Sequence, residues 1–241
     1  MGCYMLGNYV NAIAIIVGCL FGLLIHRGLK EKYKKIMMQA IGLSVILIGS
    51  TIALGGLLDP DSEAVLFIIS LVIGGIIGEM LAIDKALDNF GAMLQKKFGS
   101  ENNNIAQGFV TASLIFCVGT MAIIGSLESG LRGNHDMLFA KSILDGVTSM
   151  VLATTLGIGV IFSAAAVFVY QGAIIVFAGF LEPFLTEQVI REISIIGGIL
   201  ILSIGLGMLE IKKIKTINLL PAVLIPVIYY LWILPLINLI R

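Results

Sequence analysis

Long apolar runs alternate with short polar stretches along the whole chain. Within the runs, apolar and polar residues do not alternate one by one as they would in a half-buried strand. A transmembrane α-helix needs about 20 consecutive, mainly apolar residues. The sequence offers eight such runs, at residues 8–26, 38–57, 64–83, 107–127, 138–157, 160–181, 193–211 and 217–240. We therefore predict an all-α polytopic membrane protein with about eight transmembrane helices in one membrane domain, residues 1–241, and a β-barrel is disfavoured.

The amino-acid composition also indicates a protein embedded in the lipid bilayer. Apolar residues make up 59% of the 241 residues and charged residues only 12%, about half the share of a soluble domain, and the mean hydropathy is +1.07. A soluble domain of this size could not bury so much apolar surface. The net charge is zero, so we expect the lipid bilayer as a partner and no nucleic acid. No basic segment precedes the first run, which is therefore expected to be retained as a helix.

Lysine and arginine are distributed unevenly among the predicted loops, which predicts an orientation. Eleven of the 15 basic residues fall on one side: Arg27, Lys30, Lys32, Lys34, Lys35, Lys85, Lys96, Lys97, Lys212, Lys213 and Lys215. The other side keeps Arg132, Lys141, Arg191 and Arg241. Cytoplasmic loops carry the excess of basic residues, so both termini are predicted outside the cytoplasm of a bacterial plasma (inner) membrane.

Parts of the chain resemble one another. IIVGCLFGLL (15–24) aligns with LVIGGIIGEM (71–80), which suggests that residues 8–57 and 64–127 are two copies of a helix, amphipathic helix, helix unit. A weaker third copy at 165–211 would be inverted, as in many secondary transporters. The alternative is chance alignment of Gly, Ile and Leu. The Gly-x-x-x-Gly spacings also predict close helix contacts and a homo-oligomer.

Two segments at the predicted cytoplasmic side combine lysines with an apolar face. Residues 27–39 and 87–99 each place aromatic and aliphatic side chains on one face of a helix. Such segments suit helices that lie in the membrane interface.

Asp145 is the deepest carboxylate of the predicted helices. An ionisable group inside a span is costly and needs a reason. Lys141 precedes it by one turn, and Thr148 and Ser149 follow by one turn, so their hydroxyls could complete an oxygen shell around a cation or proton. The alternative is a simple i, i+4 ion pair with Lys141 near the outer interface.

Further polar residues lie near the ends of the predicted spans. Glu128, close to Ser126, could form an acidic ring at the outer end of the fourth span, or it is a solvated loop residue. Asn11 and Gln171 could line a pathway, or they hold helices together through hydrogen bonds.

Three patches combine glycine with hydroxyl residues inside a span: VGTMAIIGS (118–126), LIGSTIALGG (47–56) and TSMVLATTLGIG (148–159). A helix can break at such a patch if the freed backbone lines a protected cavity. We expect Gly119 and Thr120 to mark such a break and the patches to meet in a pathway. Close packing without a pathway is the alternative.

Motifs for enzymatic chemistry are absent from the sequence. Neither a His-Glu-x-x-His pair, a Gly-x-Ser-x-Gly elbow nor a phosphate-binding loop occurs, so we expect no enzymatic activity and no cofactor. Cys19 and Cys117 lie inside predicted spans, where a thiol is usually a packing residue. We expect neither a disulfide nor a metal role for the cysteines, and the sequence leaves metal binding elsewhere open.

The motifs GNYVNAIAIIVGCLFG, SLIFCVGTMAIIGSLESGL, SILDGVTSMVLATTLGIGV and GGILILSIGLGMLEIKKIKTINLLPA together resemble the bacterial inner-membrane family catalogued as domain of unknown function 554. The resemblance covers nearly the whole chain. It implies a plasma-membrane protein of a kind often described as a transporter, and it implies no particular substrate.

The sequence thus predicts transport of a small solute or monovalent cation through a midplane site formed by broken helices, with coupling to a cation or proton. The expected pathway residues are Asn11, Gly119, Thr120, Ser126, Glu128, Asp145, Thr148, Ser149 and Gln171. One alternative is a scaffold or sensor that acts through its basic cytoplasmic helices. Another is a cation channel.

Overall fold

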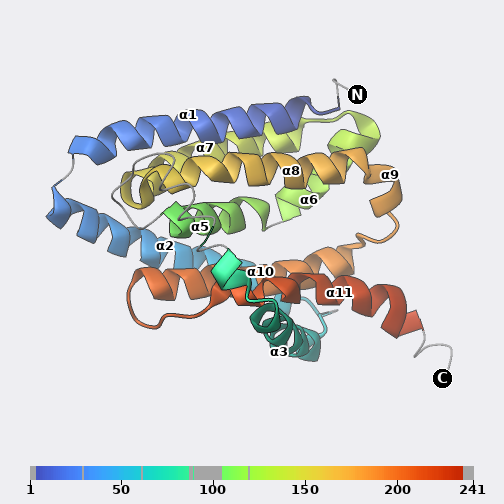
Figure 1. The fold of residues 1–241 in the computed structure, drawn as a ribbon. Coiled ribbons are helices and arrows are strands. Elements are labelled where there is room, and N and C mark those ends of the chain that lie inside the picture. The colour runs from blue at the N-terminus through green and yellow to red at the C-terminus, as the bar shows by residue number, and fades with distance from the viewer. Residues whose placement is uncertain are drawn as a thin grey trace.

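The structure, a computed structural model, describes residues 4–28, 30–60, 62–86, 89, 105–118 and 120–235. Figure 1 shows helices arranged in two layers, with α1, α5, α6, α7 and α8 in one layer and α2, α3, α10 and α11 in the other. In chain order the elements are α1 (Leu6–Gly28), α2 (Glu31–Leu57), α3 (Ala64–Met80), α5 (Ile105–Cys117), α6 (Thr120–Arg132), α7 (Asp136–Leu156), the 3-10 helix η1 (Gly157–Phe162), α8 (Ser163–Val176), α9 (Ala178–Leu181), α10 (Glu187–Met208), the 3-10 helix η2 (Thr216–Leu224), α11 (Ile225–Ile228) and the π-helix η3 (Tyr229–Ile233).

The all-helical, multi-pass prediction is confirmed at the level of helix length and composition. Within the described residues, five helical stretches are long and apolar enough to cross a membrane, or six if the bent pair α5–α6 counts as one span. The sequence predicts eight. The difference arises because α3 has a shorter apolar stretch, Val65–Met80, and because Asp136–Val176 counts as one stretch of 41 residues.

That long stretch folds back on itself. Gly157 ends α7 with a φ of +68°, a left-handed conformation that favours glycine, and η1 then turns the chain. As a result α8 runs back along α1, which also packs on α7 (Figure 1), and Asn11 on α1 hydrogen-bonds residues of both helices. The glycine-rich patch at 148–159 is therefore a helix end and a turn.

Glycines let α1 pack directly on the backbone of α7. A Cβ atom built on Gly18 would lie 2.0 Å from the carbonyl oxygen of Gly146, and one on Gly22 would lie 2.2 Å from that of Met150. Only glycine permits this approach. The contact lies within one chain, so this glycine face is not available to a second copy.

The same device joins helices of the second layer. A Cβ on Gly49 of α2 would lie 2.6 Å from the carbonyl oxygen of Gly198 on α10. In α3, a Cβ on Gly74 would lie 2.3 Å from the backbone nitrogen of Ala222, and one on Gly78 would meet the carbonyl oxygen of Asn218. Three intramolecular helix pairs therefore account for the Gly-x-x-x-Gly pattern that led us to expect an oligomer.

Two expectations about α2 are wrong. Its charged first turns continue into the apolar part as one helix, because neither proline nor glycine interrupts residues 31–41. The patch at 47–56 does not break the helix, because α2 continues through it to Leu57. The hydroxyl of Thr51 donates a hydrogen bond to the carbonyl oxygen of Leu47 at 2.9 Å within the same helix. The second amphipathic segment, 87–99, lies outside the described residues apart from residue 89.

The fourth run does bend. Helices α5 and α6 meet at an angle of 61° next to Val118, where the glycine and threonine pattern predicts a break. Gly119 itself lies outside the described residues, as does the side chain of Thr120. A buried apolar cluster of α5, α10 and α2 residues, including Leu114, Ile201 and Val45, packs around α5.

Candidate functional site

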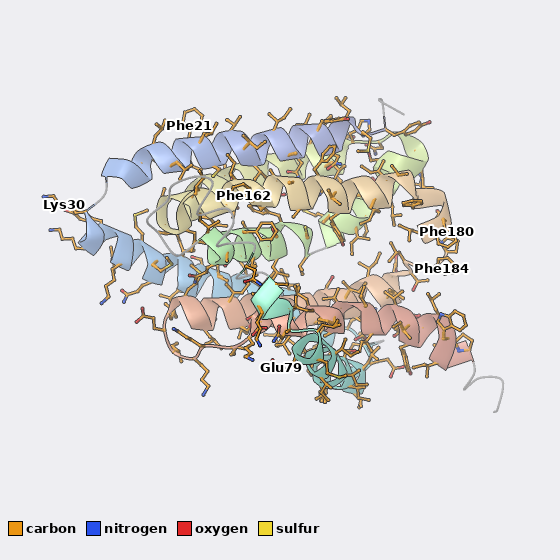
Figure 2. The ribbon with its side chains drawn as sticks, in the orientation of Figure 1. Phe21, Lys30, Glu79, Phe162, Phe180 and Phe184 are labelled. Atoms are coloured by element: carbon orange, nitrogen blue, oxygen red, sulfur yellow. The ribbon has the colours of Figure 1, made fainter. Side chains whose placement is uncertain are left out.

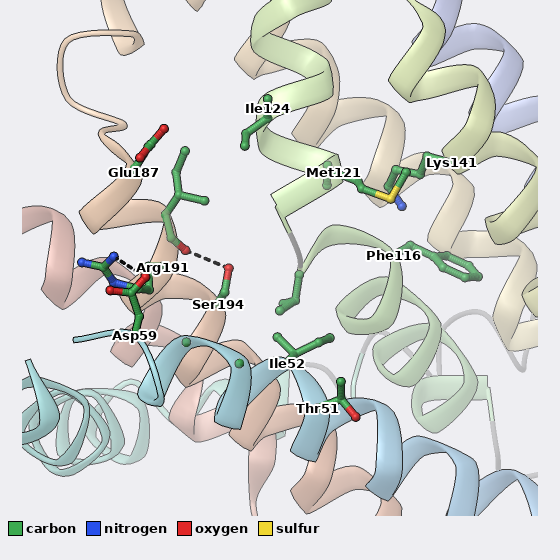
Figure 3. Close-up of a pocket in the computed structure, with 15 residues that line it drawn as sticks. Thr51, Ile52, Asp59, Phe116, Met121, Ile124, Lys141, Glu187, Arg191 and Ser194 are labelled. Atoms are coloured by element: carbon green, nitrogen blue, oxygen red, sulfur yellow. Dashed lines mark hydrogen bonds and ion pairs between the residues drawn. The ribbon is translucent and has the colours of Figure 1, made fainter. Parts of the chain in front are cut away.

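Two cavities lie where α2 and α10 of one layer face α5 of the other, and each has a volume of about 600 Å³. We name them after one lining residue each. The Lys141 cavity adjoins the α5–α6 bend (Figure 3), and its lining includes Thr51, Phe116, Val118, Lys141, Arg191 and Ser194. The Thr216 cavity adjoins the start of α5, and its lining includes Met38, Gln107, Thr111, Ser203, Lys213 and Thr216.

An ion pair lies at the α2–α10 side of the Lys141 cavity. A guanidinium nitrogen of Arg191 on α10 lies 3.0 Å from a carboxylate oxygen of Asp59, just beyond the end of α2. The Asp59 side chain is 38% exposed and that of Arg191 is 14% exposed, so the pair lies near the surface. Glu187, in the first turn of α10, adds a second carboxylate to the same wall (Figure 3).

Lys141 lies on the opposite wall, contributed by α7. Figure 3 shows its side chain beside Met121, across the cavity from Arg191. Its Nζ atom donates a hydrogen bond to Oδ2 of Asp145 at 2.5 Å and lies 5.9 Å from the centre of the Phe116 ring. Both side chains of the Lys141–Asp145 pair are less than 10% exposed, so the pair is buried inside the helical bundle.

Behind Lys141, three buried polar side chains from three helices meet. Nδ2 of Asn11 on α1 lies 3.1 Å from Oδ2 of Asp145 on α7 and 3.2 Å from Oε1 of Gln171 on α8. Asn11 and Gln171 are fully buried. Oδ1 of Asn11 and Nε2 of Gln171 have no hydrogen-bond partner among the described residues, so the network has unused capacity.

The network owes its position to close helix packing. The glycine contacts of α1 with α7 bring the two backbones together, and the hydroxyl of Ser149 bridges them by hydrogen-bonding the carbonyl oxygen of Ile15 at 3.0 Å. One helical turn earlier on each helix, this register sets Asn11 opposite Asp145. The turn at η1 then brings α8 and Gln171 to the same level.

The α5–α6 bend rests on α10. A Cβ atom built on Gly197 would lie 2.1 Å from Cγ1 of Val118, so the glycine makes room for the valine at the bend. The neighbouring Gly198 faces α2 instead, where a Cβ would lie 2.6 Å from the backbone nitrogen of Ala53. Two adjacent glycines therefore let α10 contact both the bent pair and α2, and all three elements contribute to the lining of the Lys141 cavity.

The Thr216 cavity ends in a different polar cluster. Its wall contains a hydrogen bond of 2.6 Å between the hydroxyls of Ser203 and Thr216. Lys215, also in the lining, contacts a carboxylate oxygen of Glu79 at 2.5 Å and one of Asp84 at 3.5 Å. These contacts, led by the hydrogen bond with Glu79, raise the pKa of Lys215. The backbone hydrogen bond from Lys85 chiefly lowers the pKa of the Asp84 carboxyl.

The structure brings together some of the residues that the sequence singles out and separates others. Asn11, Asp145 and Gln171 form one network. Ser149 joins α1 to α7 instead, and the hydroxyl of Ser126 donates to the carbonyl oxygen of Ala122 within its own helix. Thr148 and Glu128 are both half-buried, and neither is part of the lining of the two cavities.

Sequence reasoning missed most of the charged cavity wall. The sequence suggests Lys141 as a partner of Asp145 and as an indicator of orientation, and Arg191 as an indicator of orientation alone. It singles out neither Asp59 nor Glu187 as a site residue. The available signal was their position: each lies within one or two turns of a span end, where a charge can line a cavity as well as mark a side.

The helices and the buried ionic groups together define a multi-pass helical membrane protein with cavities between its helices. The chain belongs to the family described as Protein of unknown function (DUF554), whose model matches residues 6–231. It is 41% identical to the uncharacterized membrane protein YdfK of Bacillus subtilis (strain 168) over 223 residues, which cover 92% of this chain and 94% of that protein. It is 28% identical to the uncharacterized protein YqgA of Escherichia coli (strain K12), again over 92% of this chain and 94% of that protein. No solved structure matches it.

Proposed function

We propose that this protein carries a small solute across the bacterial plasma membrane by alternating access. The observation that carries the proposal is the pair of cavities at the two ends of α5 with a closed apolar segment between them. Along α5, Thr111 lines one cavity and Phe116 lines the other. A helix rises 1.5 Å per residue, so the closed segment is only about 8 Å long at this helix.

The closed segment consists of packed hydrocarbon. Leu114 of α5, Leu200 and Ile201 of α10 and Val45 of α2 belong to one buried cluster between the two cavities. Hydrated solutes do not cross such a segment unless the helices around it move. A shift of the bent pair against α10, at the contact between Val118 and Gly197, would open one cavity toward the other.

The proposal includes eight crossings of the membrane. The bent pair α5–α6 and the short α3 each provide one, and α7 and α8 provide two because the chain turns at η1. The Lys141 cavity then opens to the outside, and the Thr216 cavity, with Lys213 and Lys215, opens to the cytoplasm.

We also retain the repeat-like units of residues 8–57 and 64–127 as part of the proposal. Their equivalent glycines behave alike: Gly18 and Gly22 in the first unit, and Gly74 and Gly78 in the second, all contact the backbone of a partner helix. The coupling ion or proton is placed at Asp145, the buried carboxylate behind the Lys141 cavity.

Cysteine labelling tests whether the cavities open on opposite sides. Cys3, Cys19 and Cys117 are first replaced, and Ser194→Cys or Ser203→Cys then places one thiol in each cavity. A membrane-impermeant maleimide should label Ser194→Cys from the outside of cells and Ser203→Cys only in inverted vesicles. Ser70→Cys, at a fully buried α3 position outside both cavity linings, is the matched control and should remain unlabelled. Labelling of both cavity positions from one side would contradict the proposal.

A further inference from the structure

We infer that the solute is a small carboxylate with an apolar body, which binds the Lys141 ammonium and is carried together with a proton on Asp145. This inference rests on the proposed function and specifies its substrate class. It starts from an asymmetry in the buried ion pair. Lys141 is part of the cavity wall, whereas Asp145 is not and lies behind it among the amides of Asn11 and Gln171.

A solute in the cavity therefore meets the cation of this pair first. A lysine ammonium has three hydrogen-bond donors. Asp145 accepts the hydrogen bond that the structure shows from Lys141 within the described residues, so donors remain for an acceptor in the cavity. A carboxylate that approaches Lys141 competes with Asp145 for the same charge.

Displacement of Asp145 from Lys141 by the solute favours protonation of the Asp145 carboxylate. Without Lys141 the buried Asp145 carboxylate would be an uncompensated charge in a low-dielectric environment, which is strongly unfavourable. Binding of one proton to Asp145 from the same side as the solute removes that charge and leaves an O–H donor. Lys141 keeps its own proton throughout, so one anion and one proton enter together and the site stays neutral.

The amide network suits both states of Asp145. In the structure Nδ2 of Asn11 donates to the carboxylate, while Oδ1 of Asn11 is buried without a partner in the described part of the chain. Rotation of this amide would present Oδ1 as an acceptor for protonated Asp145. Nε2 of Gln171, also buried and without a partner, is a spare donor for the same rearrangement.

Other titratable and charged side chains lie near the Lys141–Asp145 pair. Cys117 of α5 also interacts with Lys141 and Asp145. Across the cavity, Arg191 is held by Asp59 at 3.0 Å and Glu187 lies beside them (Figure 3). That wall already contains two carboxylates for one guanidinium, so the anion site is the Lys141 wall.

The apolar lining of the Lys141 wall defines the rest of the solute. Phe116 and Met121 lie next to Lys141, and Ile52 and Ile124 complete this part of the cavity. A carboxylate whose body is a short hydrocarbon or keto-hydrocarbon chain matches one ammonium set among apolar side chains.

The test uses the full-length protein in liposomes and radiolabelled pyruvate as the carboxylate probe. Pyruvic acid has a low pKa, so very little of the membrane-permeant free acid is present near neutral pH, and propionamide serves as the uncharged probe. Protein-free liposomes give the background. An inward proton gradient should drive concentrative uptake of pyruvate by the wild type, with acidification of trapped pyranine, and should not drive uptake of propionamide.

Two variants separate binding from coupling. Asp145→Asn keeps Lys141 and should still exchange labelled for unlabelled pyruvate, but a proton gradient should no longer drive uptake. The double variant Lys141→Gln/Asp145→Asn removes both charges, which avoids an unpaired buried ion, and should lower pyruvate exchange by roughly 30-fold or more. Size-exclusion chromatography establishes that both variants are folded.

The possible results distinguish this inference from the proposed function. Uptake of pyruvate that persists in the folded double variant would overturn the role of Lys141. Cysteine labelling from opposite sides without any uptake of pyruvate would overturn the carboxylate inference and leave alternating access standing. Labelling of both cavities from one side would overturn the proposed function itself.

Discussion

At the scale of single residues, the adjacent glycines 197 and 198 face different partners. Gly197 accommodates Val118 at the bend, and Gly198 faces α2. A methyl group at position 197 would overlap a side chain, which can move, whereas one at position 198 would overlap backbone atoms. Position 197 should therefore tolerate a methyl group better than position 198, although the sequence shows only two consecutive glycines.

We predict that Gly197→Ala destabilises the protein by about 1–3 kcal/mol, the usual cost of overpacking a well-packed contact. Because the atoms that clash are methyl groups of Val118, the double variant Val118→Ala/Gly197→Ala should recover part of the loss. Thermal unfolding in detergent provides the measurement.

Gly207→Ala is the matched control, since it lies in the same helix and nothing lies within 4 Å of a Cβ built there. It should be neutral or slightly stabilising, because alanine favours a helix by up to about 1 kcal/mol over glycine. Strictly additive effects of the Val118 and Gly197 changes would show that the two residues are not in contact.

The sequence was informative about Asp145 and less so about Lys141. A carboxylate deep in a span is conspicuous, and the pair with Lys141 follows from their i, i+4 spacing. The contacts of Asn11 with Asp145 and Gln171 depend on which helices pack together. Asn11 is 134 positions from Asp145 and 160 from Gln171 in sequence, and the α1–α7 contact and the turn at η1 bring these residues together.

At the scale of the elements, Lys215 forms a clasp between the segment before η2 and the end of α3, through Glu79 and Asp84. The lowered pKa of Asp84 means that its contribution to stability is present above the ordinary value of 3.8 and is lost as the pH falls below it. The raised pKa of Lys215 means that its contribution is present up to 10.5 and is lost as the pH rises further.

We therefore predict that Lys215→Met lowers the melting temperature slightly at neutral pH. The effect should be small because the side chains are largely exposed and solvent screens the pair. The difference from the wild type should shrink below about pH 4 and again above about pH 10.5, as each partner loses its charge. A pH series of melting curves measures this, and a difference that is constant from pH 3 to pH 11 would contradict the ionic clasp.

Sequence patterns predicted some elements better than others. The bend in the fourth run and the turn near residue 157 coincide with glycines inside apolar sequence. A similar pattern in α2 does not break the helix, because there Gly49 serves a close contact with α10. Glycine indicates that the backbone needs space or freedom, and only the tertiary contacts decide which of the two applies.

At the scale of the whole molecule, the start of α1 and the end of α11 lie toward the same end of the two-layer arrangement (Figure 1), which agrees with the even number of crossings that we propose. Figure 2 shows Lys30 and Glu79 well away from Phe180 and Phe184, which lie at the α9 end. From the charge distribution we predict that the Lys30 end faces the cytoplasm.

Reporter fusions test this orientation. Alkaline phosphatase, which is active only outside the cytoplasm, should be active when fused after residue 184 or after residue 241. Green fluorescent protein, which fluoresces only inside, should fluoresce when fused after residue 212. Activity of phosphatase after residue 212, or fluorescence after residue 241, would show that the number of crossings or the orientation is wrong.

The α1–α7 contact also has a consequence for biosynthesis. Gly18 and its partner Gly146 are 128 residues apart in sequence. At a synthesis rate of about 5–20 residues per second, α1 waits roughly 6–26 seconds before α7 exists. During that interval the amides of Asn8 and Asn11 have neither of their final partners, Phe168 and Asp145. We therefore expect the first helix to remain at the insertion machinery at least until the fifth predicted span, which carries Asp145, has been made.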